Sequence, residues 1–571
     1  MAGAAAASPS SAPEEPPGRG SGGAGDSAEC QLAADAGRRS AADGGEAGGE
    51  ARSDMHSGGP VGLDDLPLDL LECVLACVGD LTTVRGVCSL WRDWADARVT
   101  SAGPHAHDPT AARNEAALAC LGAYRGAERI RSLSISGGQG IPATAYAHLS
   151  ALKSLSDLSV ARCGLTAREV AALCDALRAC SAPVTRLDFS GNYGLGKDAV
   201  QALCQWLSAR KRGDPALLEL CLDQCFDVDD TCITQLASAA PKLQVLSLQD
   251  CPAVSDDGLW GLEGMTSLRE LDLRSLKLVS DEGLRPLSRL AGLTKLCLRA
   301  CDGGGETTDY NRLFGVTSDG MRFLGNLTNL QSLDLSLGRV SDVGIAKLAP
   351  LTGLTCLHVR RCPRLTDRAV TAIAANFPRL RDLDVAWNES LTDDGTTALS
   401  ALTELTRLSL EGRGVSGRVS RISDKTLLAI AAIPGLRELD VSRCDIGDAG
   451  VSGLLAGGAP LSHLDLSHCP RVSAASCAAL ASVGSLRELW LNDCHVGNAG
   501  LMALAGGAGG RVRLRGLRRL SLQGAAGVDG QGVGHLAGLP ALEELHLDGC
   551  GIDARSVDEL RRALPSIFVT L

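Results

Sequence analysis

The segment Leu268-Arg-Glu-Leu-Asp-Leu273, followed by Val279-Ser-Asp-Glu-Gly-Leu284, is one clean copy of a phrase that the chain repeats sixteen times. Its first half reads LxxLxL and its second half DxGLxxL. The first apolar position of each LxxLxL copy falls at residues 130, 155, 184, 217, 243, 268, 293, 330, 354, 380, 405, 436, 461, 486, 517 and 542. Most intervals are 24 to 26 residues long. A fixed period of this kind indicates a repeat architecture.

The two halves of the phrase have different spacings. LxxLxL predicts one short strand whose leucines point inward, whereas DxGLxxL has the spacing of a helix. A single repeat cannot enclose its own apolar face, so each repeat must stack on its neighbours. The sequence therefore predicts an α/β fold, a leucine-rich repeat solenoid shaped as a horseshoe, with parallel strands on the concave face and helices on the convex face.

Nine repeats carry Cys just after the predicted strand, which resembles the cysteine-containing subtype of leucine-rich repeat. These residues are Cys163, Cys225, Cys251, Cys301, Cys362, Cys444, Cys469, Cys494 and Cys550. A small apolar thiol packs well in a core, so we predict reduced core residues. The chain has no CxxC, and its closest Cys pairs lack companion ligands, so we predict no metal site and no cofactor. So many free thiols fit a reducing compartment, the cytoplasm or the nucleus.

Residues 1–60 are rich in Gly, Ala, Ser and Pro and carry nine acidic against four basic side chains. They lack apolar periodicity, so we predict a disordered tail. The rest of the chain carries −7 of the total charge of −12, which gives no reason to expect a nucleic acid partner. Since the chain has neither a signal-peptide pattern nor 18 consecutive apolar residues, we expect no association with a membrane.

A different pattern occupies residues 61–99, between the predicted tail and the repeats. Apolar residues with helical spacing follow Pro67, which suits a first helical position, and Gly79 ends the run. A second helix is predicted to begin near Asp80. We assign residues 100–129 to a helical linker and solenoid cap, and residues 130–571 to the repeats.

The 61–99 segment resembles an F-box, whose pattern is LPxxLLxxIL, then DL, then VCxxWR. The matching residues are Leu66, Pro67, Leu70, Leu71, Val74, Leu75, Asp80, Leu81, Val87, Cys88, Trp91 and Arg92. Its position directly ahead of cysteine-containing repeats is that of the F-box and leucine-rich repeat family, so the resemblance extends from Leu63 to Leu571. The alternative is an apolar helical cap that shields the first repeat.

The resemblance implies a substrate receptor of an SCF-type cullin-RING ubiquitin ligase, without catalytic activity of its own. The F-box helices would bind a Skp-type adaptor, and the horseshoe would bind a protein substrate for ubiquitination and proteasomal degradation. The implied adaptor-binding residues are Leu66, Pro67, Leu70, Leu71, Val74, Leu75, Val87, Cys88 and Trp91. The alternative is a repeat scaffold that binds its partner without an adaptor. We find no catalytic motif such as GxSxG, GxxxxGK[ST] or HExxH.

The third, fifth and seventh positions counted from each first leucine alternate away from the leucines and line the predicted concave face. Trp490 is the exceptional residue there, because aromatics are only 3% of the chain. We predict a substrate-binding role for it beside Glu488, with packing against its neighbours as the alternative. Arg299, His358 and Arg360, near Asp384, form a predicted cationic group for an acidic segment, with charge balancing as the alternative. Substrate binding is thus predicted at Trp490, Glu488, Arg299, His358, Arg360 and Asp384.

Two repeats are enlarged after their strands. The repeat that starts at Leu293 continues until the next one starts at Leu330, and its excess, Cys301 to Val316, includes Tyr310 and Phe314. The repeat that starts at Leu405 continues until Leu436, and its excess, Gly412 to Arg421, includes Arg418. We predict that both loops leave the same edge of the sheet and border the substrate site. Neutral insertion is the alternative, since loops tolerate length at little cost.

Overall fold

The computed structural model describes residues 83–84, 118, 127, 130–138, 140–210, 213–301, 315–413, 420–506 and 514–571. The chain divides into two units, Met1–Asp65 and Leu66–Leu571, and all described residues belong to the second. The predicted tail lies outside the described residues, as does the F-box-like segment apart from Thr83–Val84. The sequence predicted a helix beginning near Asp80, but these two residues form strand β1, which pairs with Ser132 and Leu133.

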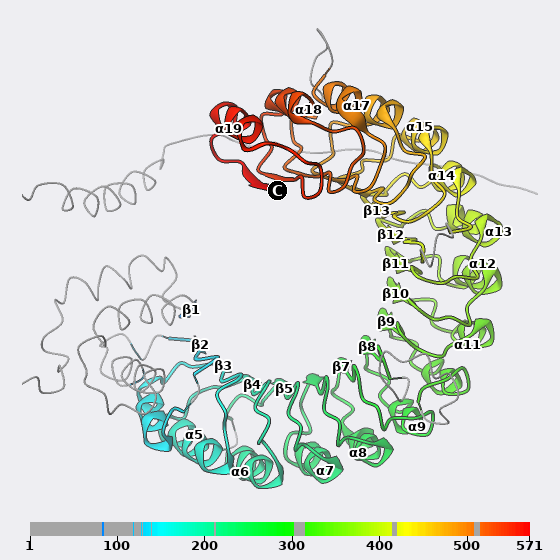
Figure 1. The fold of residues 1–571 in the computed structure, drawn as a ribbon. Coiled ribbons are helices and arrows are strands. Elements are labelled where there is room, and N and C mark those ends of the chain that lie inside the picture. Colours follow the sequence, from blue (N-terminus) through cyan, green and yellow to red (C-terminus); the bar gives the residue numbers. More distant parts are fainter. Residues whose placement is uncertain are drawn as a thin grey trace, which may run out of the picture. The chain divides into compact units, whose positions relative to one another are not determined.

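The repeats form one parallel sheet on the inner side of the solenoid (Figure 1). Each strand pairs with the next one along the chain. After β1 the strands are β2 (Ser132–Ser134), β3 (Asp157–Ser159), β4 (Arg186–Asp188), β5 (Glu219–Cys221), β6 (Val245–Ser247), β7 (Glu270–Asp272), β8 (Lys295–Cys297), β9 (Ser332–Asp334), β10 (Cys356–His358), β11 (Asp382–Asp384), β12 (Arg407–Ser409), β13 (Glu438–Asp440), β14 (His463–Asp465), β15 (Glu488–Trp490), β16 (Arg519–Ser521), β17 (Glu544–His546) and β18 (Phe568–Thr570). Strands β2 to β17 confirm the sixteen predicted repeats, each starting two residues after its first apolar position. Strand β18 was not predicted.

The helices lie on the outer, convex side (Figure 1). They are η3 (Ala143–Ala151), α5 (Ala167–Cys180), α6 (Lys197–Ser208), α7 (Asp230–Ala239), α8 (Asp256–Gly261), η4 (Leu262–Gly264), α9 (Leu284–Leu287), α10 (Met321–Leu324), α11 (Asp342–Lys347), α12 (Asp367–Asn376), α13 (Asp393–Thr396), η5 (Thr397–Ala401), α14 (Asp424–Ile430), α15 (Asp448–Ala456), α16 (Ala474–Leu480), α17 (Gly497–Leu504), α18 (Gly530–His535), η6 (Leu536–Gly538) and α19 (Ala554–Ala563). The predicted α/β leucine-rich repeat solenoid is confirmed.

One continuous core runs between the strands and the helices. The leucines of the LxxLxL phrase fill it: Leu268, Leu271 and Leu273 are each at most 1% exposed. The residues on either side of the central leucine, such as Glu270 and Asp272, are only half-buried. The alternation predicted from the sequence therefore sets which side chains face the concave surface.

Eight of the nine cysteines after the strands are buried, as predicted. Each thiol also donates a hydrogen bond to a backbone carbonyl of the preceding repeat. Cys251 Sγ lies 3.0 Å from the oxygen of Leu222, and Cys362 Sγ lies 3.3 Å from that of Leu335. Some repeats use a buried asparagine near this place: Asn192 donates to the carbonyl of Val160 and accepts from two backbone amides. The position after each strand thus favours a small side chain whose hydrogen-bond donor links successive repeats.

Eight aspartates near helix starts link neighbouring repeats, and we call this set the helix-start ladder. Asp393 accepts hydrogen bonds from the backbone nitrogen of Ser423 at 2.8 Å and from its Oγ at 2.6 Å. The ladder comprises Asp230, Asp256, Asp281, Asp342, Asp367, Asp393, Asp424 and Asp448. Each of these carboxylates bonds a residue just ahead of the next helix, so the Ser-Asp pair of the repeated phrase holds neighbouring repeats in register.

The glycine of the DxGL phrase is explained by the same ladder. A Cβ on Gly395 would overlap the carboxylate of Asp367 and lie 2.7 Å from its Cα. The next repeat has Thr426 in place of glycine, and its hydroxyl donates to Asp393 Oδ1 at 2.7 Å. Glycine avoids this overlap, and threonine uses its hydroxyl to bond the neighbouring aspartate, while Ala369 is a methyl-bearing exception in the repeat of α12.

Candidate protein-binding surface

Two rows of side chains on the concave face carry the candidate site. The first-position row is the first residue of each strand, and from β10 to β17 it contains Cys356, Asp382, Arg407, Glu438, His463, Glu488, Arg519 and Glu544. The third-position row is the third residue of each strand, and over the same strands it contains His358, Asp384, Ser409, Asp440, Asp465, Trp490, Ser521 and His546. Strand register places the members of each row side by side.

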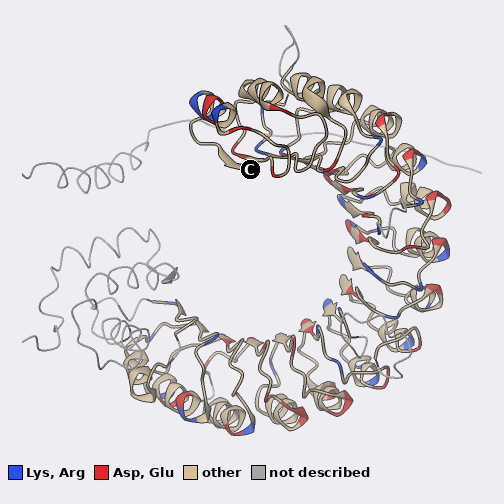
Figure 2. Ribbon diagram, viewed as in Figure 1, with Lys and Arg blue, Asp and Glu red and all other residues tan. Residues whose placement is uncertain are grey.

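Charges of opposite sign alternate along the first-position row. Arg407 lies 2.9 Å from Asp382 and 2.7 Å from Glu438. Arg519 likewise bridges two acids, Glu488 at 3.2 Å and Glu544 at 2.6 Å. Figure 2 shows both signs of charge on the strands of this part of the solenoid. Because the arginine side chains are about half exposed, each pair contributes little to stability, and the row presents a charge pattern to a partner.

The third-position row is acidic between β11 and β14. Asp384, Asp440 and Asp465 are half-buried, and burial raises the pKa of each carboxyl. For Asp465 the pKa rises to about 6, since the neighbouring Asp440 adds repulsion to the effect of burial. Each carboxylate accepts a hydrogen bond from the backbone nitrogen two residues later, as Asp465 does from Ser467 at 2.8 Å.

Trp490 occupies the third position of β15, as predicted, and is half-buried. Its register neighbours are Asp465 on β14 and Ser521 on β16. Glu488, on the same strand, pairs with His463 at 3.3 Å and with Arg519. Trp490 therefore offers a partly exposed aromatic surface at the end of the acidic row.

Two residues of the predicted cationic group, His358 and Arg360, form ion pairs with acidic side chains. His358 Nε2 lies 3.2 Å from Asp382 Oδ1, and Arg360 forms an ion pair with Glu411. Both residues therefore contact acidic partners on other repeats. Arg299 is exposed and follows β8, two strands away from β10.

Glu411 belongs to a larger charged network that sequence reasoning missed. Arg443 Nε lies 3.5 Å from Glu411 Oε1, and Arg443 Nη2 lies 3.1 Å from His468 Nε2. His468 Nδ1 in turn lies 3.0 Å from Asp493. These residues follow the strands at similar places in successive repeats, and aligning the repeats at those positions would have found them.

Several predicted site residues lie outside the described residues. They are the loop residues Tyr310, Phe314 and Arg418 and the adaptor-binding residues Leu66, Pro67, Leu70, Leu71, Val74, Leu75, Val87, Cys88 and Trp91. The described ends of the second enlarged loop are held to the preceding repeat. Arg413 forms an ion pair with Glu389, and the backbone of Arg421 bridges to that of Thr392.

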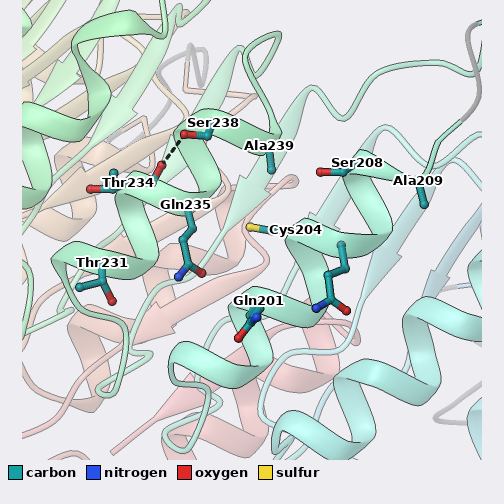
Figure 3. A pocket seen from close by; sticks show the side chains of 10 residues that line it. Gln201, Cys204, Ser208, Ala209, Thr231, Thr234, Gln235, Ser238 and Ala239 are labelled. Carbon is teal, nitrogen blue, oxygen red and sulfur yellow. Dashed lines mark hydrogen bonds between the residues drawn. The ribbon is translucent and has the colours of Figure 1, made fainter.

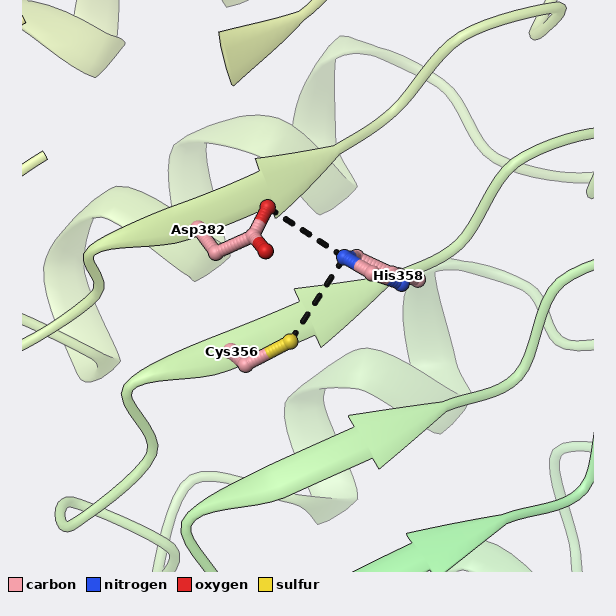
Figure 4. Close-up of side chains that lie close together, drawn as sticks. All are labelled: Cys356, His358 and Asp382. Atoms are coloured by element: carbon pink, nitrogen blue, oxygen red, sulfur yellow. Dashed lines mark hydrogen bonds and ion pairs between the residues drawn. The ribbon is translucent and has the colours of Figure 1, made fainter. Parts of the chain in front are cut away.

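Cys356, His358 and Asp382 form a compact cluster on β10 and β11 (Figure 4). Their sulfur, nitrogen and oxygen atoms all lie within 4.8 Å of one another. Hydrogen bonds with Asp382 and with Cys356 raise the pKa of His358 to about 10. The sequence singled out only His358, because Asp382 is brought to Cys356 by the pairing of β10 with β11 and not by proximity in the chain.

A groove of about 870 Å³ lies on the convex side, between α6 and α7 (Figure 3). Small and polar side chains line it, including Gln201, Cys204, Thr231 and Gln235. The Oε1 atom of Gln235 is buried without a hydrogen-bond partner among the described residues. The described lining residues include no charged group, and the groove is remote from the concave rows.

A protein-family model described as a leucine-rich repeat matches residues 326–349, 379–400, 435–455 and 485–505. These four segments are leucine-rich repeats. A leucine-rich repeat protein of Leptospira interrogans aligns over 78% of this chain and 90% of its own, at 17% identity and a TM-score of 0.38. The leucine-rich repeat is a protein-binding fold.

Two curated relatives match shorter parts of the chain. A protein of Arabidopsis thaliana described as a putative F-box/LRR-repeat protein is 27% identical over 155 residues, which are 25% of this chain and 61% of that protein. The antagonist of mitotic exit network protein 1 of Eremothecium gossypii is 28% identical over 150 residues, 26% of this chain and 31% of that protein. The chain thus spans less than two thirds of the length of either relative. Within the part of the chain that the structure describes, no helix has both the length and the apolar character to cross a membrane.

Proposed function

We propose that this chain is the substrate-recognition subunit of an SCF-type (Skp–cullin–F-box) ubiquitin ligase. It binds a Skp-type adaptor, and through it a cullin-RING ligase, and it presents a protein substrate for ubiquitination and proteasomal degradation. The observation that carries the proposal is the F-box-like motif placed directly ahead of a leucine-rich repeat solenoid. The name of the Arabidopsis relative supports it.

The solenoid supplies a surface suited to the second half of this task. Strands lie about 4.8 Å apart, so the region from β10 to β15 spans about 24 Å. A standard interface buries about 800 Å² per partner and therefore needs only part of the concave face. We assign substrate binding to Trp490, Glu488, Arg299, His358, Arg360 and Asp384, together with the loop residues Tyr310, Phe314 and Arg418.

The adaptor test uses the double variant Leu66→Ala with Pro67→Ala. Purified wild-type chain is expected to bind a Skp-type adaptor at micromolar concentration, and the double variant is expected to lose most of this binding. Truncation of well-packed apolar side chains costs about 2 to 5 kcal/mol, which a pull-down or calorimetry detects. Unaltered melting of the solenoid in the variant confines the loss to the adaptor contact. Absence of any association by the wild-type chain refutes the ligase role and leaves the adaptor-independent scaffold.

The substrate test uses Trp490→Ala. Aromatic side chains at the centre of an interface carry a large share of the binding energy, so capture of the substrate is expected to fall while adaptor binding persists. Trp260→Ala is the matched control, because Trp260 is 38% exposed on the convex helix α8. A fall in melting temperature that accounts for the lost capture would assign Trp490 to packing instead.

A further inference from the structure

Strand pairing brings three potential metal ligands together on the concave face. Cys356 and His358 are the first and third residues of β10, so their side chains project to the same side of the sheet. Asp382, the first residue of β11, is the register partner of Cys356. Figure 4 shows the carboxylate and the thiol both directed at the imidazole. A thiol, an imidazole and a carboxylate thus converge on one point from two adjacent strands.

Two of the three distances between these atoms match the edges of a zinc coordination tetrahedron, and all three atoms lie within 4.8 Å of one another. His358 Nε2 lies 3.5 Å from Cys356 Sγ and 3.2 Å from Asp382 Oδ1. Zinc binds sulfur at about 2.3 Å and nitrogen or oxygen at about 2.0 to 2.1 Å. Tetrahedral angles then separate sulfur from nitrogen by about 3.6 Å and nitrogen from oxygen by about 3.3 Å. His358 Nε2 therefore lies at the distance of a fellow ligand from both the thiol and the carboxylate.

The same geometry argues against a Cys-His-Asp catalytic relay. In a relay the two ring nitrogens face different partners, so that one orients the ring while the other takes the proton of the nucleophile. Here the sulfur and the carboxylate both lie at Nε2. Convergence of a thiol and a carboxylate on one ring nitrogen fits a shared cation and does not fit proton transfer from the thiol to a histidine held by the acid.

Arg407 orients the carboxylate of the cluster. Asp382 Oδ2 lies 2.9 Å from Arg407 Nη1, which leaves Oδ1 as the oxygen that faces the cluster. A hydrogen bond of this kind orients a ligating carboxylate from outside the coordination sphere. The side chains of His358 and Asp382 are 32% and 20% exposed, so the cluster opens to solvent on the concave face.

We propose that Cys356, His358 and Asp382 bind one Zn²⁺ ion, with its fourth coordination position open to the concave surface. A mixed sulfur, nitrogen and oxygen set suits zinc better than magnesium or calcium, which prefer oxygen alone. Bound zinc fastens β10 to β11 and offers its fourth position to water or to a donor atom of a partner. The site stands independently of the ligase role, since it needs only the described strands.

Titration of the purified full-length chain with Co²⁺, followed by competition with Zn²⁺, tests the proposal. Cobalt in a tetrahedral site with one thiolate gives a charge-transfer band and strong visible bands. One equivalent is expected to bind, and Zn²⁺ is expected to abolish the spectrum. Cys356→Ser and His358→Gln are each expected to weaken binding by more than the about 10- to 100-fold typical of residues outside the coordination sphere.

The matched control is Cys221→Ser, because Cys221 is also a half-buried cysteine on a concave strand, β5. It is expected to leave the spectrum and the affinity unchanged. Zn²⁺ is also expected to raise the melting temperature of the wild-type chain and not that of Cys356→Ser, and melting in metal-free buffer checks that each variant folds. Failure of the wild-type chain to bind at micromolar metal, or binding by both ligand variants equal to that of the wild type, overturns the proposal.

Discussion

Aspartates occupy two parts of this solenoid, and the surroundings of the carboxylate differ between them. In the helix-start ladder, burial acts to raise the pKa of Asp393, but hydrogen bonds from Ser423 and Thr426 outweigh it and lower the pKa. In the third-position row, burial outweighs the bonds that Asp465 accepts and raises its pKa to about 6. Asp440 accepts three hydrogen bonds, as Asp393 does, yet its pKa is raised, because it is the more deeply buried of the two. The comparison teaches that the balance between burial and hydrogen bonding decides whether a carboxylate stabilises the repeats. The ladder holds repeats together, whereas the acidic row keeps a charged surface at a cost in stability.

Removal of a ladder carboxylate is expected to have the largest effect. Asp393→Ala leaves the amide and hydroxyl of Ser423 and the hydroxyl of Thr426 without their acceptor. We expect a loss of about 3 kcal/mol, since partly buried donors left unsatisfied each cost about 1 kcal/mol or more. Chemical denaturation measures it. The control is Asp394→Ala, an exposed neighbour whose amide still donates to Thr392. Equal losses of stability in the two variants would show that the ladder carboxylate stabilises the fold no more than an exposed one does.

Crowding the ladder without removing a carboxylate is the second test. Gly395→Ala places a Cβ against Asp367, and overpacking of this kind costs about 1 to 3 kcal/mol. Gly264→Ala is the control, because nothing lies within 4 Å of its Cβ position. A lower melting temperature for the first variant alone is the expected result, and Gly395→Ser is expected to recover part of the loss by donating to Asp367.

The acidic row is expected to respond in the opposite direction. Asp465→Asn keeps an acceptor for the amide of Ser467 and removes the charge, so we expect a gain of about 1 to 2 kcal/mol at pH 7. Because the folded pKa exceeds the unfolded value, wild-type stability contains a contribution that grows as pH falls from above 6 to below about 4. The variant is expected to lack this contribution, and melting curves across that range measure it. Destabilisation at pH 7 would contradict the assignment.

The smallest effect is expected in the first-position row. Arg519→Gln breaks pairs with Glu488 and Glu544 that are substantially exposed, so the melting temperature is expected to change by less than about 2 °C. The change is expected to shrink further at high salt, since ions screen exposed pairs. A double-mutant cycle with Glu544→Gln isolates the pair, and a large coupling would show that this row is structural.

The sixteen strands, the inward leucines and the buried cysteines followed from the sequence because each depends on a spacing within one repeat. The contacts that join repeats did not. Asp382 and Cys356 lie one full repeat apart in the sequence, and the ion pair between Arg360 and Glu411 reaches across two. Such pairs become visible only when strand register is known. The sequence showed Trp490 on the surface because a lone aromatic in a row of small residues is evident without register.

The reactivity of the thiols that link the repeats can also be used to measure local opening of the solenoid. Burial raises the pKa of Cys251 and of Cys362 to about 12, so these thiols are almost entirely protonated at neutral pH and react slowly. Each becomes reactive only when its own repeat separates from the one before it. Timed labelling with a thiol reagent, read by mass spectrometry, would therefore assign an opening free energy to each of nine places along the chain.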